Sequence, residues 1–250
     1  MILLGDIGNT DTKICLVNSN NKIVKRLNFN TKNIDYFILK KKFKKINFKN
    51  IKINKCLFCS VVPKSYKLIK SFLIQKYNLK SYELKNLPLN KFIKIKANNK
   101  QIGSDRLANA ISVMNKKDNF VIIDFGTATT FDVLIKNFYH GGIIAPGLKI
   151  SLNTLVEKAS LIPDLNLKKV NKVIGLNTVS AVRSGFFWGY TGLIKNILKL
   201  IKQETKKSFK IIMTGGFSNL FKDSINYKAT INKDITIKGL IKASKLINQK

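Results

Sequence analysis

Short apolar runs alternate with polar turns along the first part of the chain. A first strand is predicted at 1–7, and a turn at 8–11 leads into a second strand at 13–18. Another polar turn, at Asn20 and Asn21, precedes a third apolar run at 23–29. Apolar runs separated by turns rich in Asn, Asp and Gly are typical of neighbouring strands. The N-terminal stretch is therefore predicted to form strands joined by short turns.

Helices are predicted where apolar residues recur at a spacing of three or four. A buried strand at 56–62 ends at Pro63, and a helix with one apolar side follows. A second helix is expected to begin at Ser104. Later helices at 179–202 and 237–248 are expected to cover a second sheet. The mixture of strands and helices predicts an α/β fold.

The pattern of strand, turn and strand recurs in the second half of the chain. An apolar run at 120–123 reaches an aspartate and a glycine-containing turn, and a second strand is predicted at 129–135. The segments Asp-Ile-Gly-Asn-Thr at 6–10 and Asp-Phe-Gly-Thr-Ala at 124–128 lie 118 positions apart. This recurrence predicts two similar domains. Their expected bounds are 1–116 and 117–250.

The two repeated turns have the chemistry of a phosphate site. A carboxylate at a strand end can hold a cation, and a glycine lets backbone N–H groups approach phosphate oxygens. One Asp-x-Gly turn is a weak signal, because hairpins commonly use it. Two at matching places favour a nucleotide held between two domains, as in the actin, hexokinase and Hsp70 superfamily. A third turn, Thr214-Gly215-Gly216, fits the adenosine end, although a plain strand-to-helix turn explains it equally well.

The 250 residues carry a net charge of +33, which raises the question of nucleic-acid binding. The basic residues are 43 lysines and only three arginines, and the lysines are spread along the chain. Recognition of base edges relies on the guanidinium fork, which lysine lacks. A lysine-rich solvated surface is therefore favoured over a specific nucleic-acid interface.

Targeting signals and disulfides are not predicted. No apolar run free of charged residues reaches the roughly 18 residues that a membrane span needs. The N-terminus lacks the positively charged segment with which a signal peptide begins. The three cysteines suggest no disulfide framework, and Cys56 and Cys59 are expected to lie in the core. A cytoplasmic protein without a membrane partner is the resulting expectation.

Several segments together resemble the type III pantothenate kinase family, in the order in which that family has them. The resemblance implies two duplicated ribonuclease H-like (actin-like ATPase) domains with a nucleotide cleft between them. It also implies transfer of a phosphoryl group from ATP to pantothenate, the first step toward coenzyme A, by a homodimer. The segments are GDIGNT (5–10), SVVP (60–63), IGSDR (102–106), IDFGTATTFDV (123–133), GGIIAPGL (141–148), GLNTVSAVRSG (175–185) and TGG (214–216).

The resemblance also implies roles for individual residues. Asp105 would be the proton acceptor, and Asp124 would hold a potassium or ammonium ion, while Mg²⁺ would accompany the nucleotide. Pantothenate would meet Gly103, Ser104, Asp105, Arg106 and Thr178. ATP would meet Asp6, Ile7, Gly8, Asn9, Thr10, Asp11, Thr12, Lys13 and Thr127.

The role of Asp105 can also be argued from its position. Phosphoryl transfer passes through a loose transition state, so a positioned carboxylate suffices as the base. A helix N-terminus and the neighbouring Arg106 both favour the ionised carboxylate. Helix capping is the simpler alternative for an aspartate at this place.

One departure from the family pattern concerns the substrate pocket. The family usually has a tyrosine nine residues before the catalytic aspartate, and Lys96 occupies that position here. Together with the net charge of +33, this departure motivates an alternative function. In that alternative the chain is a non-catalytic regulatory or nucleic-acid-binding accessory protein of the same family.

Overall fold

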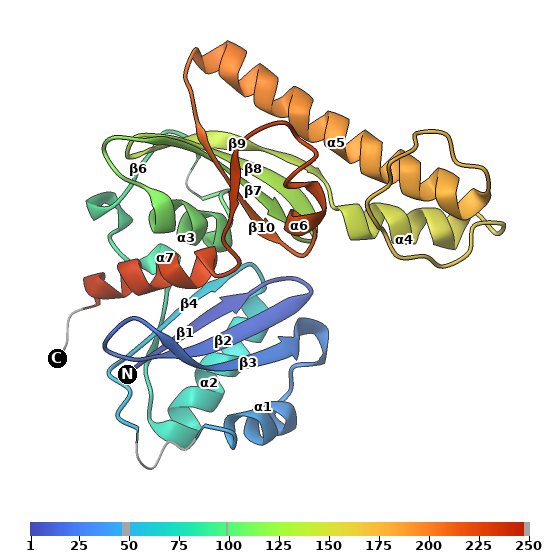
Figure 1. The fold of residues 1–250 in the computed structure, drawn as a ribbon. Coiled ribbons are helices and arrows are strands. Elements are labelled where there is room, and N and C mark those ends of the chain that lie inside the picture. The colour runs from blue at the N-terminus through green and yellow to red at the C-terminus, as the bar shows by residue number, and fades with distance from the viewer. Residues whose placement is uncertain (47–50, 99, 248–250) are drawn as a thin grey trace. The chain divides into compact units, whose positions relative to one another are not determined.

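The computed structural model describes residues 1–46, 51–98 and 100–247, and the chain forms two compact units (Figure 1). The first unit contains 1–114, 137–139 and 234–250, and the second contains 115–136 and 140–233. The chain thus leaves the first unit and returns to it at its C-terminal end.

A five-stranded mixed sheet forms the centre of the first unit, in the order β3-β2-β1-β4-β5. β1 runs antiparallel to β2 and parallel to β4, so Asp6 lies opposite Lys13 on one side and Cys59 on the other. The middle strands are buried because their side chains are apolar on both faces. The strands are β1 (Ile2–Ile7), β2 (Asp11–Val17), β3 (Ile23–Asn30), β4 (Lys55–Ser60) and β5 (Ser81–Glu83).

Local capping fixes where the helices of this unit begin and end. The Asp35 carboxylate accepts a hydrogen bond of 2.6 Å from the Ile38 N–H at the start of α1. Pro63 opens α2, and Asn78 ends it in the left-handed conformation. The helices are α1 (Tyr36–Phe43), α2 (Pro63–Tyr77), α3 (Ser104–Val113) and α7 (Ile235–Ala243), with 3-10 turns at Thr31–Asn33, Leu84–Asn86, Leu89–Lys91 and Ser244–Leu246.

The expectation that a helix at 237–248 covers the second sheet is wrong, and Asn248 lies outside the described residues. The helix is α7, and it packs on α3 in the first unit. Thr236 donates a hydrogen bond of 2.8 Å to Asn109, and a Cβ at Gly239 would lie 1.8 Å from the Ala108 carbonyl oxygen. Apolar spacing shows that a helix has a buried side, but not which partner buries it.

The second unit repeats the sheet of the first. Its strands follow the order β11-β10-β7-β8-β9, which matches β5-β4-β1-β2-β3, and β7 is antiparallel to β8 and parallel to β10. This repetition confirms the predicted mixed α/β fold with a duplicated sheet. The strands are β7 (Asn119–Phe125), β8 (Ala128–Ile135), β9 (Phe138–Pro146), β10 (Lys210–Gly215) and β11 (Ala229–Ile231). A short strand, β6 (Lys94–Ile95), pairs with the first residues of β9.

Three helices accompany this sheet: α4 (Leu148–Lys158), α5 (Thr178–Thr205) and α6 (Ser218–Phe221). α5 begins with a capping box, in which Asn177 and Ser180 exchange side-chain and backbone hydrogen bonds. Phe187 of α5 is buried and stacks on Phe221, with ring centroids 5.9 Å apart. This packing holds α5 against α6.

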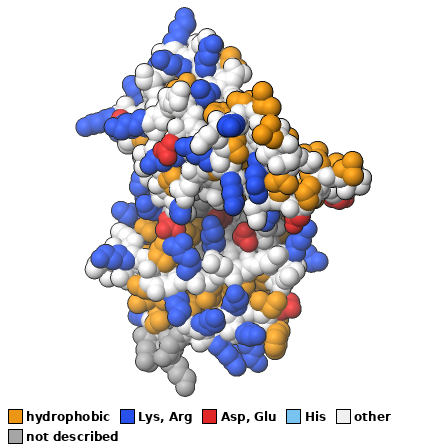
Figure 2. Space-filling view, turned by 45° about the vertical axis from the view of Figure 1, so that its right-hand side comes forward, with side chains coloured by type: hydrophobic (Ala, Val, Ile, Leu, Met, Phe, Trp, Pro, Cys, Tyr) orange, Lys and Arg blue, Asp and Glu red, His pale blue; other side chains and the backbone are white. Residues whose placement is uncertain are grey.

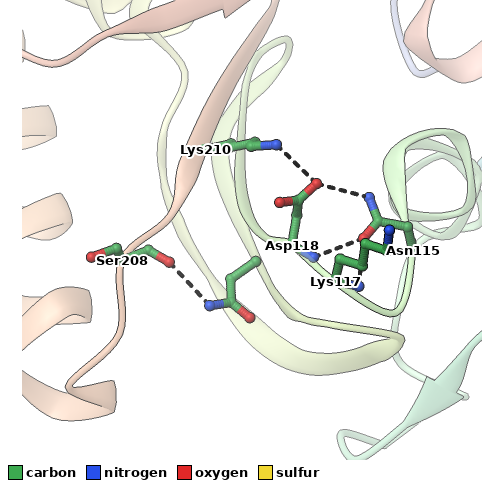
Figure 3. Close-up of polar contacts among 6 residues, drawn as sticks. Asn115, Lys117, Asp118, Ser208 and Lys210 are labelled. Atoms are coloured by element: carbon green, nitrogen blue, oxygen red, sulfur yellow. Dashed lines mark hydrogen bonds and ion pairs between the residues drawn. The ribbon is translucent and has the colours of Figure 1, made fainter.

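A polar network holds the first residues of β7 next to those of β10 (Figure 3). The Asn115 side chain accepts hydrogen bonds from the N–H groups of Lys117 and Asp118, at 2.8 and 2.7 Å. Asp118 pairs with Lys210 at 2.8 Å, and this contact lowers the pKa of Asp118. The network lies at the opposite ends of these strands from Asp124 and Gly215.

Lysine and arginine side chains are scattered over the face shown in Figure 2 rather than gathered in one patch. None of the helices in residues 1–46, 51–98 and 100–247 is both long and apolar enough to cross a membrane.

Candidate active site

The first predicted phosphate turn joins β1 to β2. Asp6 lies at the end of β1, and its Oδ1 accepts a hydrogen bond of 3.6 Å from the thiol of Cys59 on β4. The turn closes with a hydrogen bond of 3.0 Å from the Gly8 N–H to the Asp11 carbonyl. The carboxylate and the glycine turn therefore meet at one end of the strands, as a phosphate site requires.

The charge of Asp6 depends on its enclosure by protein. Burial, with a smaller contribution from the negative charge of Asp105, raises the pKa of Asp6 from 3.8 to about 6. Lys13 and the Cys59 thiol oppose this rise without cancelling it. A nearby cation or bound cation–phosphate group would favour the ionised form of this carboxylate.

The segment from Asp6 to Lys13 divides into exposed and buried members. Asn9, Thr10, Asp11 and Lys13 are exposed at the turn. The Ile7 side chain is buried in the core, and Thr12 shares a buried hydrogen bond of 2.8 Å with Thr31. Ile7 and Thr12 can therefore contribute backbone groups or support to the turn, but their side chains are used within the unit.

Asp105 lies in the first turn of α3, beside Ser104. Its Oδ1 accepts a hydrogen bond of 2.8 Å from the Arg106 N–H. A Cβ at Gly103 would stand only 2.4 Å from this oxygen, so the absence of a side chain at Gly103 lets the carboxylate curl back. Gly103, and not Asp105, occupies the capping position of the helix.

The electrostatic expectation for Asp105 is corrected by its burial. Desolvation raises the pKa of Asp105, although the Arg106 hydrogen bond, the Arg106 charge and Lys85 all lower it. The sequence predicted the contribution of Arg106 but could not predict the burial that outweighs it. A carboxylate with a raised pKa is a stronger base than an exposed one.

Sequence reasoning missed Glu83, which ends β5. Glu83 Oε1 accepts a hydrogen bond of 2.5 Å from the Ser104 hydroxyl, and Oε2 accepts one of 2.6 Å from the Lys85 N–H. No sequence motif marks this residue. The parallel pairing of β4 with β5 brings it near α3.

Lys96, at the position of the family tyrosine, lies beside the start of β9. Its N–H donates to the Tyr139 carbonyl at 3.0 Å, and its ammonium lies 5.6 Å from the centre of the Phe138 ring. The side chain is exposed. A cation thus lies on an aromatic ring here, an arrangement that leaves the ammonium able to meet an anion.

The second predicted phosphate turn joins β7 to β8. Asp124 lies opposite Thr130 and Thr214 in the sheet, as Asp6 lies opposite Lys13 and Cys59. The turn closes with a hydrogen bond of 3.1 Å from the Gly126 N–H to the Ala128 carbonyl, and Thr127 is exposed. The carboxylate and carbonyl oxygens here are ligands suited to a hard cation.

Two glycines permit close backbone contacts around this turn. A Cβ at Gly147 would lie 1.8 Å from the Thr127 carbonyl oxygen. Gly215, the middle of the third predicted turn, has φ of +85°, and a Cβ there would lie 2.4 Å from the Phe125 carbonyl oxygen. Larger residues would push the chain away from the strand ends.

Thr178 is the first residue of α5 and is exposed. It follows the capping residue Asn177, and a Cβ at Gly175 would lie 2.2 Å from the Ala181 nitrogen. The segment before the helix is thereby held against the first turn of α5. Thr178 belongs to the second unit, whereas Gly103, Ser104, Asp105 and Arg106 belong to the first.

Comparisons with known proteins identify the family of this chain. The sequence model of the type III pantothenate kinase family matches residues 2–200. A type III pantothenate kinase of Pelagibacter ubique is 68% identical over 99% of this chain and 100% of its own length.

Solved structures show the same fold. A Campylobacter jejuni protein assigned to the Baf family of transcriptional activators has a TM-score of 0.62 and 20% identity, over 97% of each chain. A Sinorhizobium meliloti protein assigned as a 2-dehydro-3-deoxygalactonokinase has a TM-score of 0.61 and 9% identity, over 98% of each chain. At these identities the likeness shows the fold alone, so it does not support the regulatory alternative. The family match and the full-length relative together show that this chain belongs to the type III pantothenate kinase family.

Proposed function

We propose that this protein transfers the γ-phosphoryl group of ATP to the primary hydroxyl of pantothenate, the first step toward coenzyme A. The observation that carries the proposal is the 68% identity, over the full length, to a type III pantothenate kinase. The enclosed Asp105 in the first turn of α3 supplies the base that such a transfer uses.

Asp105 accepts the proton of the substrate hydroxyl. Because the transition state of phosphoryl transfer is loose, the proton leaves late and the carboxylate mainly orients the nucleophile. The raised pKa of Asp105 strengthens it as a base, while Arg106 and Lys85 each oppose that rise. Gly103, Ser104, Arg106 and Thr178 are proposed to line the pantothenate site.

Each half, 1–116 and 117–250, is proposed to contribute one phosphate turn. Residues 6–13 would bind ATP phosphates through backbone N–H groups and the exposed polar side chains, and Thr127 would contact ATP from the other half. Asp124 would hold a potassium or ammonium ion, with Mg²⁺ accompanying the nucleotide. Such cations neutralise phosphate charge during transfer.

A homodimer in the cytoplasm is the proposed form of the enzyme. The second unit exposes large apolar side chains, including Leu161 and Leu176, each 89% exposed, and Ile174 at 80%. Figure 2 shows hydrophobic side chains gathered on its right-hand side. Apolar surface of this kind is typical of a protein–protein interface. No specific nucleic acid or membrane partner is proposed.

The test of catalysis is a coupled assay of ADP release with pantothenate, ATP and potassium. Wild-type protein is expected to turn over, and Asp105→Asn is expected to lose on the order of 100-fold or more in kcat, because the amide cannot accept the proton. Replacing potassium with sodium is expected to lower the rate. An inactive wild type, or an Asp105→Asn variant as active as wild type, would refute the proposal.

The test of the dimer is the molar mass in solution, measured by light scattering. Wild-type protein is expected at twice the chain mass of 28.3 kDa. The double variant Leu161→Ser, Leu176→Ser is expected to shift toward monomer, because it removes two apolar side chains that the dimer interface would bury. Ile74→Ser, 43% exposed in the first unit, serves as the control. A monomeric wild type would contradict the proposed dimer.

A further inference from the structure

The start of α3 has no side-chain cap, unlike the starts of α1 and α5. Gly103 occupies the capping position and has no side chain with which to accept a hydrogen bond. A side chain at this position would have to displace the Asp105 carboxylate, because a Cβ would stand 2.4 Å from its oxygen. The geometry that lets Asp105 curl back thus removes the usual means of fixing the helix start.

Glu83 compensates from outside the helix. One of its carboxylate oxygens accepts from the hydroxyl of Ser104, the residue between Gly103 and Asp105. Ser104 is 1% exposed, so water cannot replace this partner. A hydrogen bond of 2.5 Å to a carboxylate belongs to the strong, charge-assisted kind.

The other oxygen of Glu83 holds the turn that carries Lys85. It accepts from the Lys85 N–H at 2.6 Å, which makes Glu83 the cap of the 3-10 turn Leu84–Asn86. The Lys85 ammonium donates to the Lys100 carbonyl at 3.2 Å, and its charge favours the ionised form of Asp105. One carboxylate therefore connects the residue before Asp105 with a cation that acts on Asp105.

We propose that Glu83 is a positioning residue for phosphoryl transfer. It fixes the first turn of α3 by accepting a hydrogen bond from Ser104, and it fixes the 3-10 turn that contains Lys85 by accepting one from the Lys85 N–H. This inference rests on the proposed role of Asp105. Glu83 does not touch the reacting atoms in this scheme; it acts through the placement of Asp105. A small displacement of a catalytic group is enough to slow a reaction on the order of 100-fold.

The test compares Glu83→Ala, Glu83→Gln and a matched control, Asp35→Ala, in the same ADP-release assay. Asp35 also accepts a 2.6 Å hydrogen bond at a helix start in the first unit, but at α1. Glu83→Ala is expected to lower kcat on the order of 10- to 100-fold and to leave the KM for ATP within about twofold. Glu83→Gln keeps one carbonyl oxygen in place of two carboxylate oxygens and removes the negative charge, so an intermediate kcat is expected.

Two further readouts separate positioning from a general loss of structure. The double variant Glu83→Ala, Ser104→Ala is expected to have a kcat no lower than that of the slower single variant. Both changes remove the same hydrogen bond, between Ser104 and Glu83, so their effects do not add. The acid limb of the pH profile of kcat/KM is expected to move to higher pH in Glu83→Ala, because Lys85 no longer stabilises ionised Asp105. Asp35→Ala is expected to lower the melting temperature without either effect.

The outcomes distinguish this inference from the proposed function. An inactive wild type refutes both. An active wild type, an inactive Asp105→Asn and a fully active Glu83→Ala refute the positioning role alone, as does an Asp35→Ala variant with the same fall in kcat and the same pH shift. If Glu83→Ala does not fold, Glu83→Gln decides: wild-type kcat and an unmoved acid limb overturn the role.

Discussion

At the scale of single residues, burial decides the chemistry of the two carboxylates in the first unit. Asp6 and Asp105 each have a raised pKa, and in both desolvation is the largest cause. Asp105 also raises the pKa of Asp6, since two like charges disfavour each other's ionisation. The ionised forms of these two carboxylates therefore cost the folded protein stability.

Replacing Asp6 with Asn is expected to stabilise the fold at neutral pH. The pKa of Asp6 rises from 3.8 to about 6 on folding, so between these values the folded chain binds this proton more tightly than the unfolded chain. Stability contributed by this group is therefore lost as pH rises through that window. Asp6→Asn removes a penalty of about 3 kcal/mol at pH 7 and above.

Urea unfolding of wild type and Asp6→Asn at a series of pH values measures this effect. The variant is expected to be the more stable at about pH 7.5, and the difference is expected to shrink toward about pH 4. Subtracting the free energy of unfolding of wild type from that of the variant removes the contributions of the other titrating groups. A difference that does not change with pH would contradict the assignment. Activity is expected to fall in the same variant.

At the scale of elements, the two hairpins show why a short motif could be found in the sequence. Asp6 and Asp124 each end the central strand of their sheet and stand opposite the second hairpin strand and a parallel strand. The same backbone pairing requires the same glycine-containing turn, so the residues repeat with the structure. The packing of α7 has no such local requirement.

Substituting Gly239 by Ala is expected to destabilise the contact of α7 with α3. A Cβ would stand 1.8 Å from the Ala108 carbonyl oxygen, which is backbone and cannot turn aside. The expected loss is about 1 to 3 kcal/mol in the free energy of unfolding.

Gly189→Ala in α5 is the matched control for this change. A Cβ there meets nothing within 4 Å, so alanine is expected to leave stability unchanged or raise it by up to about 1 kcal/mol. Chemical denaturation of both variants measures the difference. A Gly239→Ala variant as stable as Gly189→Ala would show that the two helices can separate without cost.

At the scale of the whole molecule, the charge of +33 belongs to the surface more than to the site. Acidic residues are few, and some are used in surface ion pairs, such as Asp234 with Arg26 at 2.8 Å. Exposed lysines fill the solvated positions, and their mutual repulsion favours solubility over compactness. Their summed field also attracts anions, including ATP.

Binding to DNA is expected to be weak and independent of sequence. Fluorescence anisotropy with two unrelated duplexes is expected to give equal affinities at about 50 mM salt and a loss of at least tenfold at about 200 mM, because binding rests on counterion release. A strong preference for one duplex that survives at about 150 mM salt would instead favour a specific nucleic-acid function.

The local features of this protein could be predicted from the order of its residues. Residue order alone predicted the hairpins at the two aspartates, the helix beginning at Ser104, the mixed α/β class and the family, because turns, caps and apolar spacing are encoded within a few residues. The resemblance of the sequence to the type III pantothenate kinase family also indicated the candidate site residues. Their roles remain proposals.

Contacts between segments that are distant in the sequence could be seen only in the folded chain. The fold placed α7 on α3, turned the side chains of Ile7 and Thr12 into the core, and brought Glu83 to Ser104. The fold also raises the pKa of Asp105, whereas the neighbouring residues alone predicted a lowered one. Desolvation depends on all the atoms packed around a group, and the adjacent residues in the sequence do not reveal them. Burial and long-range partners are properties of the folded chain.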